Sequence, residues 1–177
     1  MAKEGIADSD EDGFTYLKHI TKGEVSDDML WLYVRESKRV LAYLHEKTHV
    51  RYVPLPKYTD YYPEAPGGRP GGRSMDPVPF DGSLLREDLI RLRRPHPQSQ
   101  ILGKFGITAR EAQAAIGVGL KTMVFMAWQM FLYMLRHFKR KRWGRDTKLC
   151  AGNSLMGRLL LSLKERGVPT WLNTGVE

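Results

Sequence analysis

One stretch of the chain, residues 57–74, limits what its middle can fold into. It reads KYTDYYPEAPGGRPGGRS and combines three prolines and four glycines with three tyrosines. Proline fixes φ and lacks an amide donor, and glycine admits positive φ, so a helix or a central strand is excluded. Long loops in compact domains are functional or disordered, and disordered segments are poor in aromatic residues. We therefore predict an ordered loop that lines a pocket; the alternative is a Pro/Gly linker with incidental tyrosines.

Charge and cysteine content limit the classes of partner and compartment. The 177 residues carry a formal net charge of +8, so acidic partners have to be considered. The positive charge gathers in residues 86–94 and 136–145, whereas residues 1–28 are rich in acids. A single cysteine, Cys150, excludes an internal disulfide and fits a reducing compartment. The first residues also lack the apolar core of a signal peptide, so we expect a cytoplasmic protein.

The first third of the chain predicts two helices and a short strand. Residues 11–20 follow a cluster of cap-forming side chains, and Gly23 ends the helix. Residues 27–46 form a longer helix, because apolar side chains recur there at near-helical spacing: Leu30, Val34, Leu41 and Leu44. Residues 51–53 read as a strand that two prolines cut short.

A third helix is expected from Thr108 to about residue 141, although Gly117 and Gly119 could break it. Thr108 and Glu111 have the spacing of a capping box. The middle of this helix, residues 122–135, reads TMVFMAWQMFLYML and is nearly all apolar. A membrane span needs about 20 such residues, and this run is shorter and contains Gln129. We therefore predict a helix buried between protein layers, with its methionines filling gaps in the core; the alternative is a membrane segment.

The end of the chain predicts a turn, a helix and a strand. Residues 151–154 form a small polar turn, and residues 155–166 form an amphipathic helix with Gly167 at its C′ position. The expected inner face carries Leu155, Leu159, Leu160 and Leu163. Residues 170–174 read as a strand, so this region resembles half of a βαβ unit.

The sequence contains no motif that by itself specifies a complete catalytic site. No glycine-rich dinucleotide fingerprint lies between a strand and a helix, and no serine nucleophile elbow is present. The histidines and Cys150 do not have the spacing of metal ligands, so we expect no metal.

Two segments could bind anions. The turn that contains Gly152 and Asn153 exposes backbone N–H groups at a helix N-terminus, where an anion or a polar substrate group could bind. The alternative is an ordinary capped helix. The KRKR run at residues 139–142 could bind phosphate or nucleic acid, or could be a solvated helix end that the helix dipole favours. No nucleic-acid module accompanies it, so we expect no nucleic-acid partner.

Taken together, four segments carry a resemblance to a known family: ADSDEDGFTYL, SDDMLWLYV, DYYPEAPGGRPGGRS and LCAGNSLMGRLLLSLKERGVPTWLNTGV. They resemble the FAD-dependent oxidoreductases that include fumarate reductase flavoproteins and 3-ketosteroid dehydrogenases, and DYYPEAPGG is most similar to the ketosteroid branch. The resemblance implies an α/β fold in which residues 1–177 are one partial Rossmann-like FAD-binding domain, mostly helical here. It also implies that the fingerprint precedes Met1 and the substrate-capping domain follows Glu177.

The resemblance also implies roles for particular residues. Tyr61 or Tyr62 would be catalytic by supporting the base tyrosine of the capping domain, while flavin accepts hydride from the adjacent carbon. The backbone at Val176 would meet the adenine of FAD, and Gly152 and Asn153 are further candidates for cofactor contacts. The implied partners are a small apolar ketone or steroid and the remainder of the flavoenzyme chain.

Two other functions stay open at this point. A fumarate-reductase-like enzyme would act on a carboxylated substrate, which Arg69 and Arg73 could bind unless they fold the loop. A basic, non-enzymatic binding protein is the third hypothesis. For the isolated chain we expect little or no bound FAD. We also expect an exposed apolar patch on residues 123–135, because the flanking segments that would cover it in the longer enzyme are missing.

Overall fold

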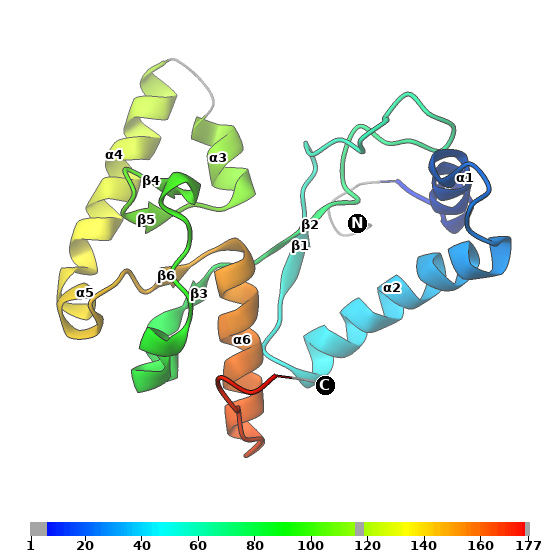
Figure 1. Cartoon of the computed structure of the whole chain (residues 1–177). Coiled ribbons are helices and arrows are strands. Elements are labelled where there is room, and N and C mark those ends of the chain that lie inside the picture. Colours follow the sequence, from blue (N-terminus) through cyan, green and yellow to red (C-terminus); the bar gives the residue numbers. More distant parts are fainter. Residues whose placement is uncertain (1–6, 116–118, 176–177) are drawn as a thin grey trace. The chain divides into compact units, whose positions relative to one another are not determined.

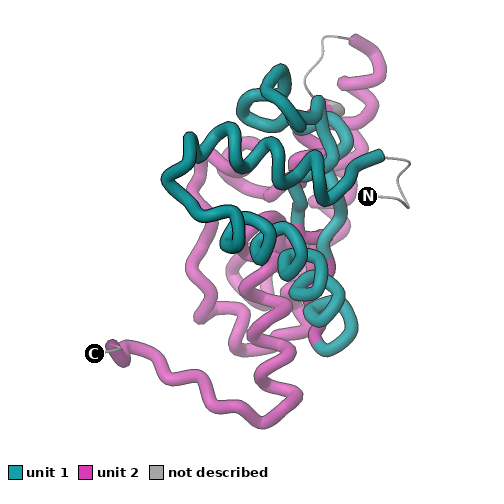
Figure 2. The backbone as a smooth tube through the Cα atoms, turned by 90° about the vertical axis from the view of Figure 1, so that its right-hand side faces the viewer, with its two compact units in different colours: residues 1–47, 52–76 teal, residues 48–51, 77–177 magenta. Residues whose placement is uncertain are grey.

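The computed structural model describes residues 7–115 and 119–175, and it divides the chain into two compact units (Figures 1 and 2). Unit 1 comprises residues 1–47 and 52–76, and unit 2 comprises residues 48–51 and 77–177. Most of the regular structure is helical, as predicted. That residues 1–177 form one partial FAD-binding domain stays a prediction.

Unit 1 contains two helices and a two-stranded sheet, in blue to cyan-green in Figure 1. Its elements are α1 (Asp10–Thr21), α2 (Asp27–Lys47), β1 (Tyr52–Pro54) and β2 (Met75–Pro77). The predicted helices are confirmed, and α1 begins where the Ser9 hydroxyl accepts a hydrogen bond from the Asp12 amide at 3.0 Å. The predicted strand forms one residue later, against β2, which the sequence did not predict.

The two helices of unit 1 pack through few apolar contacts. Tyr16, Leu30 and Val34 are buried, and the rings of Phe14 and Trp31 stack with their centroids 4.4 Å apart. This packing holds α1 and α2 side by side (Figure 1). Because α1 is fixed, its acidic first turn can serve as an anchor for the loop at residues 57–74.

Unit 2 combines four helices with short strands and 3₁₀ segments. Its elements are β3 (Phe80–Asp81), η2 (Gly82–Arg91), η3 (Pro97–Ser99), β4 (Gln100–Ile101), β5 (Phe105–Gly106), α3 (Ala109–Ala115), α4 (Leu120–Leu135), α5 (His137–Trp143), β6 (Lys148–Leu149) and α6 (Ala151–Glu165). Strand β3 pairs antiparallel with β6, and β4 pairs antiparallel with β5.

The core of unit 2 lies where η2, β3, β6 and α6 meet. It consists of Phe80, Leu85, Leu89 and Leu149, with Leu92, Trp143, Leu160 and Leu161 packed against it. Gly157 lets α6 approach β3 closely, because a Cβ there would lie 2.9 Å from the Phe80 ring. This contact fixes α6, and with it the position of its N-terminus.

The single helix expected from Thr108 to residue 141 is divided into α3, α4 and α5. The capping box is confirmed: the Thr108 amide donates to Glu111 Oε2 at 2.8 Å, and the Glu111 amide donates to Thr108 Oγ1 at 3.0 Å. Gly119, which we named as a possible helix breaker, takes an extended conformation and caps α4; Gly117, the other one, lies outside the described residues. Arg136 interrupts the helix again between α4 and α5.

The prediction that residues 122–135 are buried is wrong. Met123, Trp128 and Met134 are exposed, and the polar Gln129 is the buried residue of α4 at 5% exposure. The physical reason is that Gln129 is drawn into a polar network: its amide donates to Glu111 Oε1 at 3.1 Å, and its oxygen accepts from Lys148 Nζ at 3.3 Å. Met123 and Met134 therefore do not fill a core, whereas Met126 and Met130 are half-buried, and the expected apolar patch is present. Among the described residues, no helix combines the length and the apolarity of a membrane span.

The C-terminal region differs from its prediction at both ends. Helix α6 begins at Ala151, so the predicted turn at residues 151–154 is its first turn, and Ser154, Gly157 and Ser162 form its buried side. Leu163 is exposed, although Leu160 does pack on the core. The prediction of Gly167 at C′ is confirmed, because it has a φ of 67° and its amide donates to the Lys164 carbonyl at 3.1 Å.

Residues 170–174 do not form a strand. A parallel strand needs hydrogen bonds from a neighbouring strand, and the strands found in residues 7–115 and 119–175 pair only with one another. The expected half of a βαβ unit is therefore not formed by the described residues. The helical character of the chain is as predicted, whereas the Rossmann-like part of the prediction is not confirmed.

Candidate functional site

The loop at residues 57–74 in unit 1 is held by arginines that bind carboxylates. Arg73 donates two hydrogen bonds to the Asp8 carboxylate, at 2.8 and 3.0 Å, and one to Asp60 at 3.0 Å. Hydrogen bonding to Asp8 raises the pKa of Arg73 against the opposing effect of burial. Burial is the largest single effect on Asp8 and opposes its ionisation, but the hydrogen bond and charge of Arg73, together with the Ser9 amide and the charge of Arg69, outweigh it and lower the pKa of that carboxyl group. The pair therefore stays ionised and closes the loop onto the N-terminal segment.

Arg69 makes the second set of contacts. Its guanidinium binds Asp12 on α1, and its backbone amide donates to Asp60 Oδ2 at 2.9 Å. Gly67 has a φ of 73° and lies so close to α1 that a Cβ would overlap the Asp12 carbonyl oxygen. The loop is ordered, as predicted, and Arg69 and Arg73 serve to fold it. Two pockets among the described residues are lined by other segments, so it stays a prediction that the loop lines a pocket.

The two candidate catalytic tyrosines lie on this fixed loop with their side chains exposed. Tyr61 is 91% exposed and Tyr62 is 57% exposed. The Tyr62 backbone is tied to α1, because its amide donates to the Tyr16 hydroxyl at 3.3 Å. The arrangement presents two phenols on a constrained backbone, free to meet another surface.

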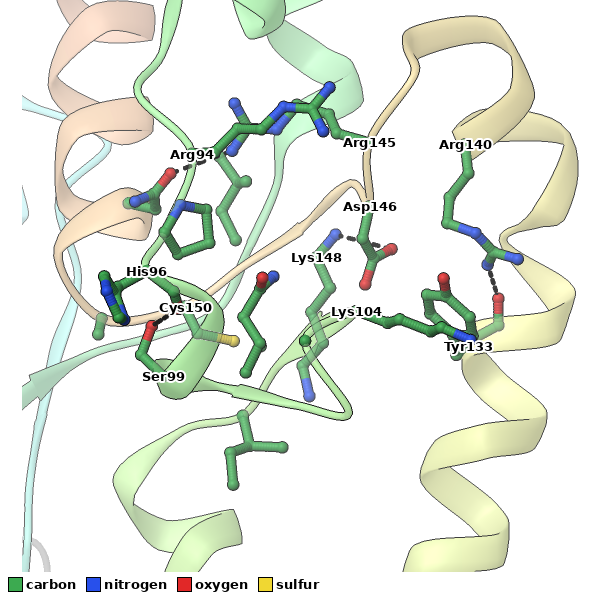
Figure 3. Close-up of a pocket in the computed structure, with 18 of the residues that line it drawn as sticks. Arg94, His96, Ser99, Lys104, Tyr133, Arg140, Arg145, Asp146, Lys148 and Cys150 are labelled. Atoms are coloured by element: carbon green, nitrogen blue, oxygen red, sulfur yellow. Dashed lines mark hydrogen bonds between the residues drawn. The ribbon is translucent and has the colours of Figure 1, made fainter.

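A pocket of about 800 Å³ lies in unit 2, between the segment around β4 and β5, the helices α4 and α5, and the N-terminus of α6 (Figure 3). Gly152 and Asn153, the candidate cofactor contacts, line it together with Cys150. Tyr61 and Tyr62 belong to unit 1, whereas this pocket belongs to unit 2.

The pocket wall is strongly cationic. Its lysines and arginines are Arg94, Lys104, Arg140, Lys141, Arg145 and Lys148. The acidic side chain in the wall is Asp146, which already accepts hydrogen bonds from Arg136 at 2.9 and 3.2 Å. Lys148 is neutralised by Glu111 at 2.7 Å, but the sum over the wall remains positive. Such a cavity favours an anionic group on its ligand.

Arg145 differs from the loop arginines because its guanidinium is bound by neutral oxygens. It is 9% exposed and donates to the carbonyls of Leu89 and Leu92, at 3.2 and 2.7 Å, and to Asn153 Oδ1 at 3.1 Å. Burial and then the charge of Arg94 lower the pKa of Arg145, which still remains far above neutrality for a guanidinium. Arg94 and Arg145 lie together at the top of Figure 3, and the charge of Asp146 offsets part of the lowering of the pKa of Arg145. The contact to Asn153 fixes that side chain at the start of α6.

The residues of this pocket fit an anionic cofactor such as FAD in their chemistry. A helix leaves its first backbone N–H groups without intrahelical partners, and the start of α6 lines this pocket. Nothing lies within 4 Å of the position that a Cβ on Gly152 would take. Val176, the third candidate cofactor contact, lies outside the described residues. Sequence reasoning missed Arg94, Arg145 and Lys148 as site residues. The signal for two of them was the pair of basic segments 86–94 and 136–145, which the fold brings to one cavity.

Comparison with known proteins decides the relationship. No family model matches the chain. The chain is 34% identical over 171 residues, which is 96% of its length, to a 3-oxosteroid 1-dehydrogenase of Comamonas testosteroni.

The chain is a relative of the 3-oxosteroid 1-dehydrogenases.

The same relationship appears in a second sequence and in a solved structure. A 3-oxosteroid 1-dehydrogenase of Mycobacterium tuberculosis is 29% identical over 185 residues, or 98% of this chain. The structure of the 3-ketosteroid Δ1-dehydrogenase of Sterolibacterium denitrificans, in complex with 1,4-androstadiene-3,17-dione, superposes with a TM-score of 0.89 over 95% of this chain, at 34% identity. The resemblance to the ketosteroid branch is thereby confirmed. The chain spans about 30% of the length of these 3-oxosteroid 1-dehydrogenases.

Proposed function

We propose that this chain is part of an FAD-dependent dehydrogenase that acts on a 3-ketosteroid or a similar flat ring ketone. The reaction removes a proton from one carbon and a hydride from the other carbon of a C–C bond next to the ketone, and this bond becomes a double bond. The observation that carries the proposal is the match, at a TM-score of 0.89 and 34% identity, to an enzyme solved with a steroid dienedione. In this proposal the chain contributes to a Rossmann-like FAD-binding domain.

FAD, when bound, supplies the hydride acceptor. Gly152 and Asn153 would hold an anionic or polar group of the cofactor at the start of α6, and the backbone at Val176 would meet the adenine. The cationic wall of the unit 2 pocket supports this assignment, as does the hydrogen bond of 3.1 Å that orients Asn153 towards Arg145.

Tyr61 or Tyr62 would assist proton removal. A phenol has a pKa of about 10, so a tyrosine that acts as a base needs hydrogen-bond donors to stabilise its phenolate form. One of these two phenols would donate to the oxygen of such a base tyrosine. Their exposure on a loop whose backbone is fixed by Arg69 and Arg73 supports that role.

The contacts of the loop arginines also favour a ketone over a carboxylated substrate. A fumarate-reductase-like site in this loop would need Arg69 or Arg73 free for a substrate carboxylate. Both guanidiniums are instead engaged by Asp8, Asp12 and Asp60. A basic binding protein without enzymatic activity is disfavoured by the match to dehydrogenases across 96% of the chain.

The experiment that tests the proposal is a chimera in which this chain replaces the matching 171 residues of the Comamonas testosteroni protein. The purified chimera should show the absorbance of bound flavin and should oxidise a 3-ketosteroid with an artificial electron acceptor. Bound flavin without ketosteroid oxidation would refute the substrate, and a folded chimera without flavin would refute the cofactor assignment. The unaltered Comamonas testosteroni protein is the control.

A second chimera keeps the proposal testable if the first does not fold. It exchanges only residues 57–74, a loop whose conformation depends on its own glycines and arginines. Retained ketosteroid oxidation would show that the tyrosine loop of this chain works in the site of a dehydrogenase. Full flavin occupancy with oxidation abolished would show that the loop does not.

A further inference from the structure

Tyr16 on α1 is a buried tyrosine that contacts the loop of the candidate catalytic tyrosines, which passes close to α1 in Figure 1. Tyr16 is 7% exposed, and its hydroxyl oxygen accepts a hydrogen bond from the Tyr62 amide at 3.3 Å, across 46 positions of the sequence. A phenylalanine would fill almost the same space without this bond. The hydroxyl therefore gives the loop a specific anchor on the helix.

The anchor acts on the peptide unit that joins the two candidate catalytic residues. The Tyr62 amide lies in one rigid plane with the Tyr61 carbonyl group. The orientation of this plane depends on ψ of Tyr61 and φ of Tyr62, which are among the few soft torsions of the backbone. A hydrogen bond to the Tyr62 amide therefore restricts the torsions that direct both phenol side chains.

The loop is also fixed on either side of this peptide. Before it, Asp60 accepts a hydrogen bond from Arg73 at 3.0 Å, and its amide donates to the Arg69 carbonyl at 3.0 Å. After it, the Ala65 amide donates to the Tyr62 carbonyl at 3.1 Å. The peptide between the tyrosines lies between these two fixed points, and α1 supplies an anchor of its own.

The Tyr16 ring is itself held in one position. The Gly67 backbone packs so closely on α1 that a Cβ there would lie 2.9 Å from the Tyr16 amide nitrogen. The Arg73 guanidinium lies over the Tyr16 ring, 5.5 Å from its centroid, and is fixed by its ion pairs with Asp8 and Asp60. The hydroxyl is thus presented to the loop by a ring that is packed on one face by a bound cation.

Phe14 on the same helix provides the contrast. Its ring stacks on Trp31 of α2 with the centroids 4.4 Å apart. Residues two positions apart in a helix are separated by roughly 200° around its axis, so Phe14 and Tyr16 meet different partners. The ring that joins α1 to α2 needs no polar atom, whereas the ring that meets the loop uses its hydroxyl.

We propose that Tyr16 is a positioning residue for the dehydrogenase reaction, an inference that rests on the proposed function. Its hydroxyl fixes the peptide between Tyr61 and Tyr62, so that the phenol of one of them meets the base tyrosine during proton removal. Loss of the hydroxyl leaves this phenol present but less well placed. Such a loss lowers kcat more than it changes KM, because the contact matters in the transition state.

The test is Tyr16→Phe in the chimera that carries the matching 171 residues of this chain. The kcat for ketosteroid oxidation should fall roughly tenfold, with KM changed less than about twofold and flavin occupancy unchanged. When the chimera already carries whichever of Tyr61→Phe or Tyr62→Phe lowers kcat, Tyr16→Phe should lower kcat no further, because the phenol that it places is absent. The matched control is Tyr43→Phe, which removes an exposed phenol hydroxyl from α2 and should leave kcat unchanged.

Hydrogen exchange, measured by mass spectrometry on the full chain, gives a second readout that does not depend on catalysis. Tyr16→Phe should speed exchange in the segment that contains Tyr62 by about threefold or more, while exchange in α2 stays the same. Equal exchange of that segment in the variant and the unaltered chain would overturn the anchoring role.

The kinetic outcomes separate this inference from the proposed function. An active chimera whose Tyr16→Phe variant keeps its kcat would overturn the role of Tyr16 alone. The same conclusion follows if the losses from Tyr16→Phe and from the deleterious loop substitution multiply, because Tyr16 would then act independently of the loop phenols. A chimera that binds flavin but oxidises no ketosteroid would refute the proposed function, and this inference with it.

Discussion

An arginine of the unit 1 loop and an arginine of the unit 2 pocket, both largely shielded from solvent, have opposite surroundings. Arg73 in the loop meets Asp8 and Asp60, and its pKa is raised by hydrogen bonding to Asp8. Arg145 in the pocket meets carbonyl and amide oxygens, and its pKa is lowered by burial and by Arg94. Both guanidiniums are hydrogen-bonded, but Arg73 forms ion pairs with carboxylates, whereas Arg145 donates to neutral oxygens.

This difference separates folding from binding. A guanidinium that is ion-paired with carboxylates of the same chain is neutralised by them and links two segments of that chain. The loop requires such a link. A guanidinium whose donors are satisfied by neutral oxygens still projects a positive field into the cavity beside it. The pocket around Gly152 and Asn153 is therefore the part of the molecule suited to an anion, although the loop contains the more conspicuous arginines.

The sharpest test of the comparison removes Arg73. Arg73→Met leaves the largely buried carboxylates of Asp8 and Asp60 with their contacts to Arg69 and Ser9 alone, which should cost up to about 3–5 kcal/mol in the free energy of unfolding. Urea denaturation of the chain measures this.

The control is Arg91→Met, which removes an exposed guanidinium from Asp88; Asp88 keeps its ion pair with Lys164, so the effect should be much smaller. Equal losses in the two variants would mean that Arg73 does not hold the loop.

Next in size is the effect of the tyrosines in the active chimera. Tyr61→Phe or Tyr62→Phe should lower kcat roughly 100-fold or more if that phenol supports proton removal, with substrate affinity changed much less. The other substitution should be milder, because neighbouring loop side chains point in different directions. The measurement is kcat and KM for both variants, with flavin occupancy checked by absorbance. If both variants keep a near-normal kcat at full flavin occupancy, neither tyrosine supports proton removal and the loop has only a structural role.

Removal of a pocket cation should have a smaller effect, on anion binding. Arg94→Ala should weaken the binding of inorganic pyrophosphate to the full chain roughly tenfold, since a hydrogen bond to a charged group is lost. Titration calorimetry measures the affinity. Arg91→Ala removes the same charge outside the pocket lining, so similar weakening there would point to non-specific attraction by the net charge.

The smallest expected effect is on acid stability. The pKa of Asp8 is lower in the folded chain than its ordinary value of 3.8. The stability that ionised Asp8 contributes to the fold is therefore complete above pH 3.8 and is lost as the pH falls through the lowered pKa of the folded state. Arg73→Met should reduce the acid-side fall in the thermal midpoint. A residual fall should persist, because the pKa values of Asp81 and Glu111 are lowered too, against burial, by Lys139 and Lys148. If the thermal midpoint of Arg73→Met falls at low pH as much as that of the unaltered chain, Arg73 does not stabilise the ionised form of Asp8.

The sequence by itself determined the features that depend on neighbouring residues. The capping box at Thr108 and Glu111, the glycine stop at Gly167 and the ordered loop at residues 57–74 all rest on contacts within a few positions or on the φ that glycine and proline allow. The relationship to the ketosteroid dehydrogenases could also be predicted, because DYYPEAPGG is a local pattern.

Only the tertiary structure decided which charged and polar groups meet across long separations. Arg73 and Asp8 are 65 positions apart, and Lys148 and Glu111 are 37 apart, so no local pattern specifies either pair. The second of these networks draws Gln129 inward and turns the apolar side of α4 outward, which reverses the prediction of a buried helix. The physical reason is that a polar group buried without its partners costs more than an apolar side chain left in water, and the partners are found only in the folded chain.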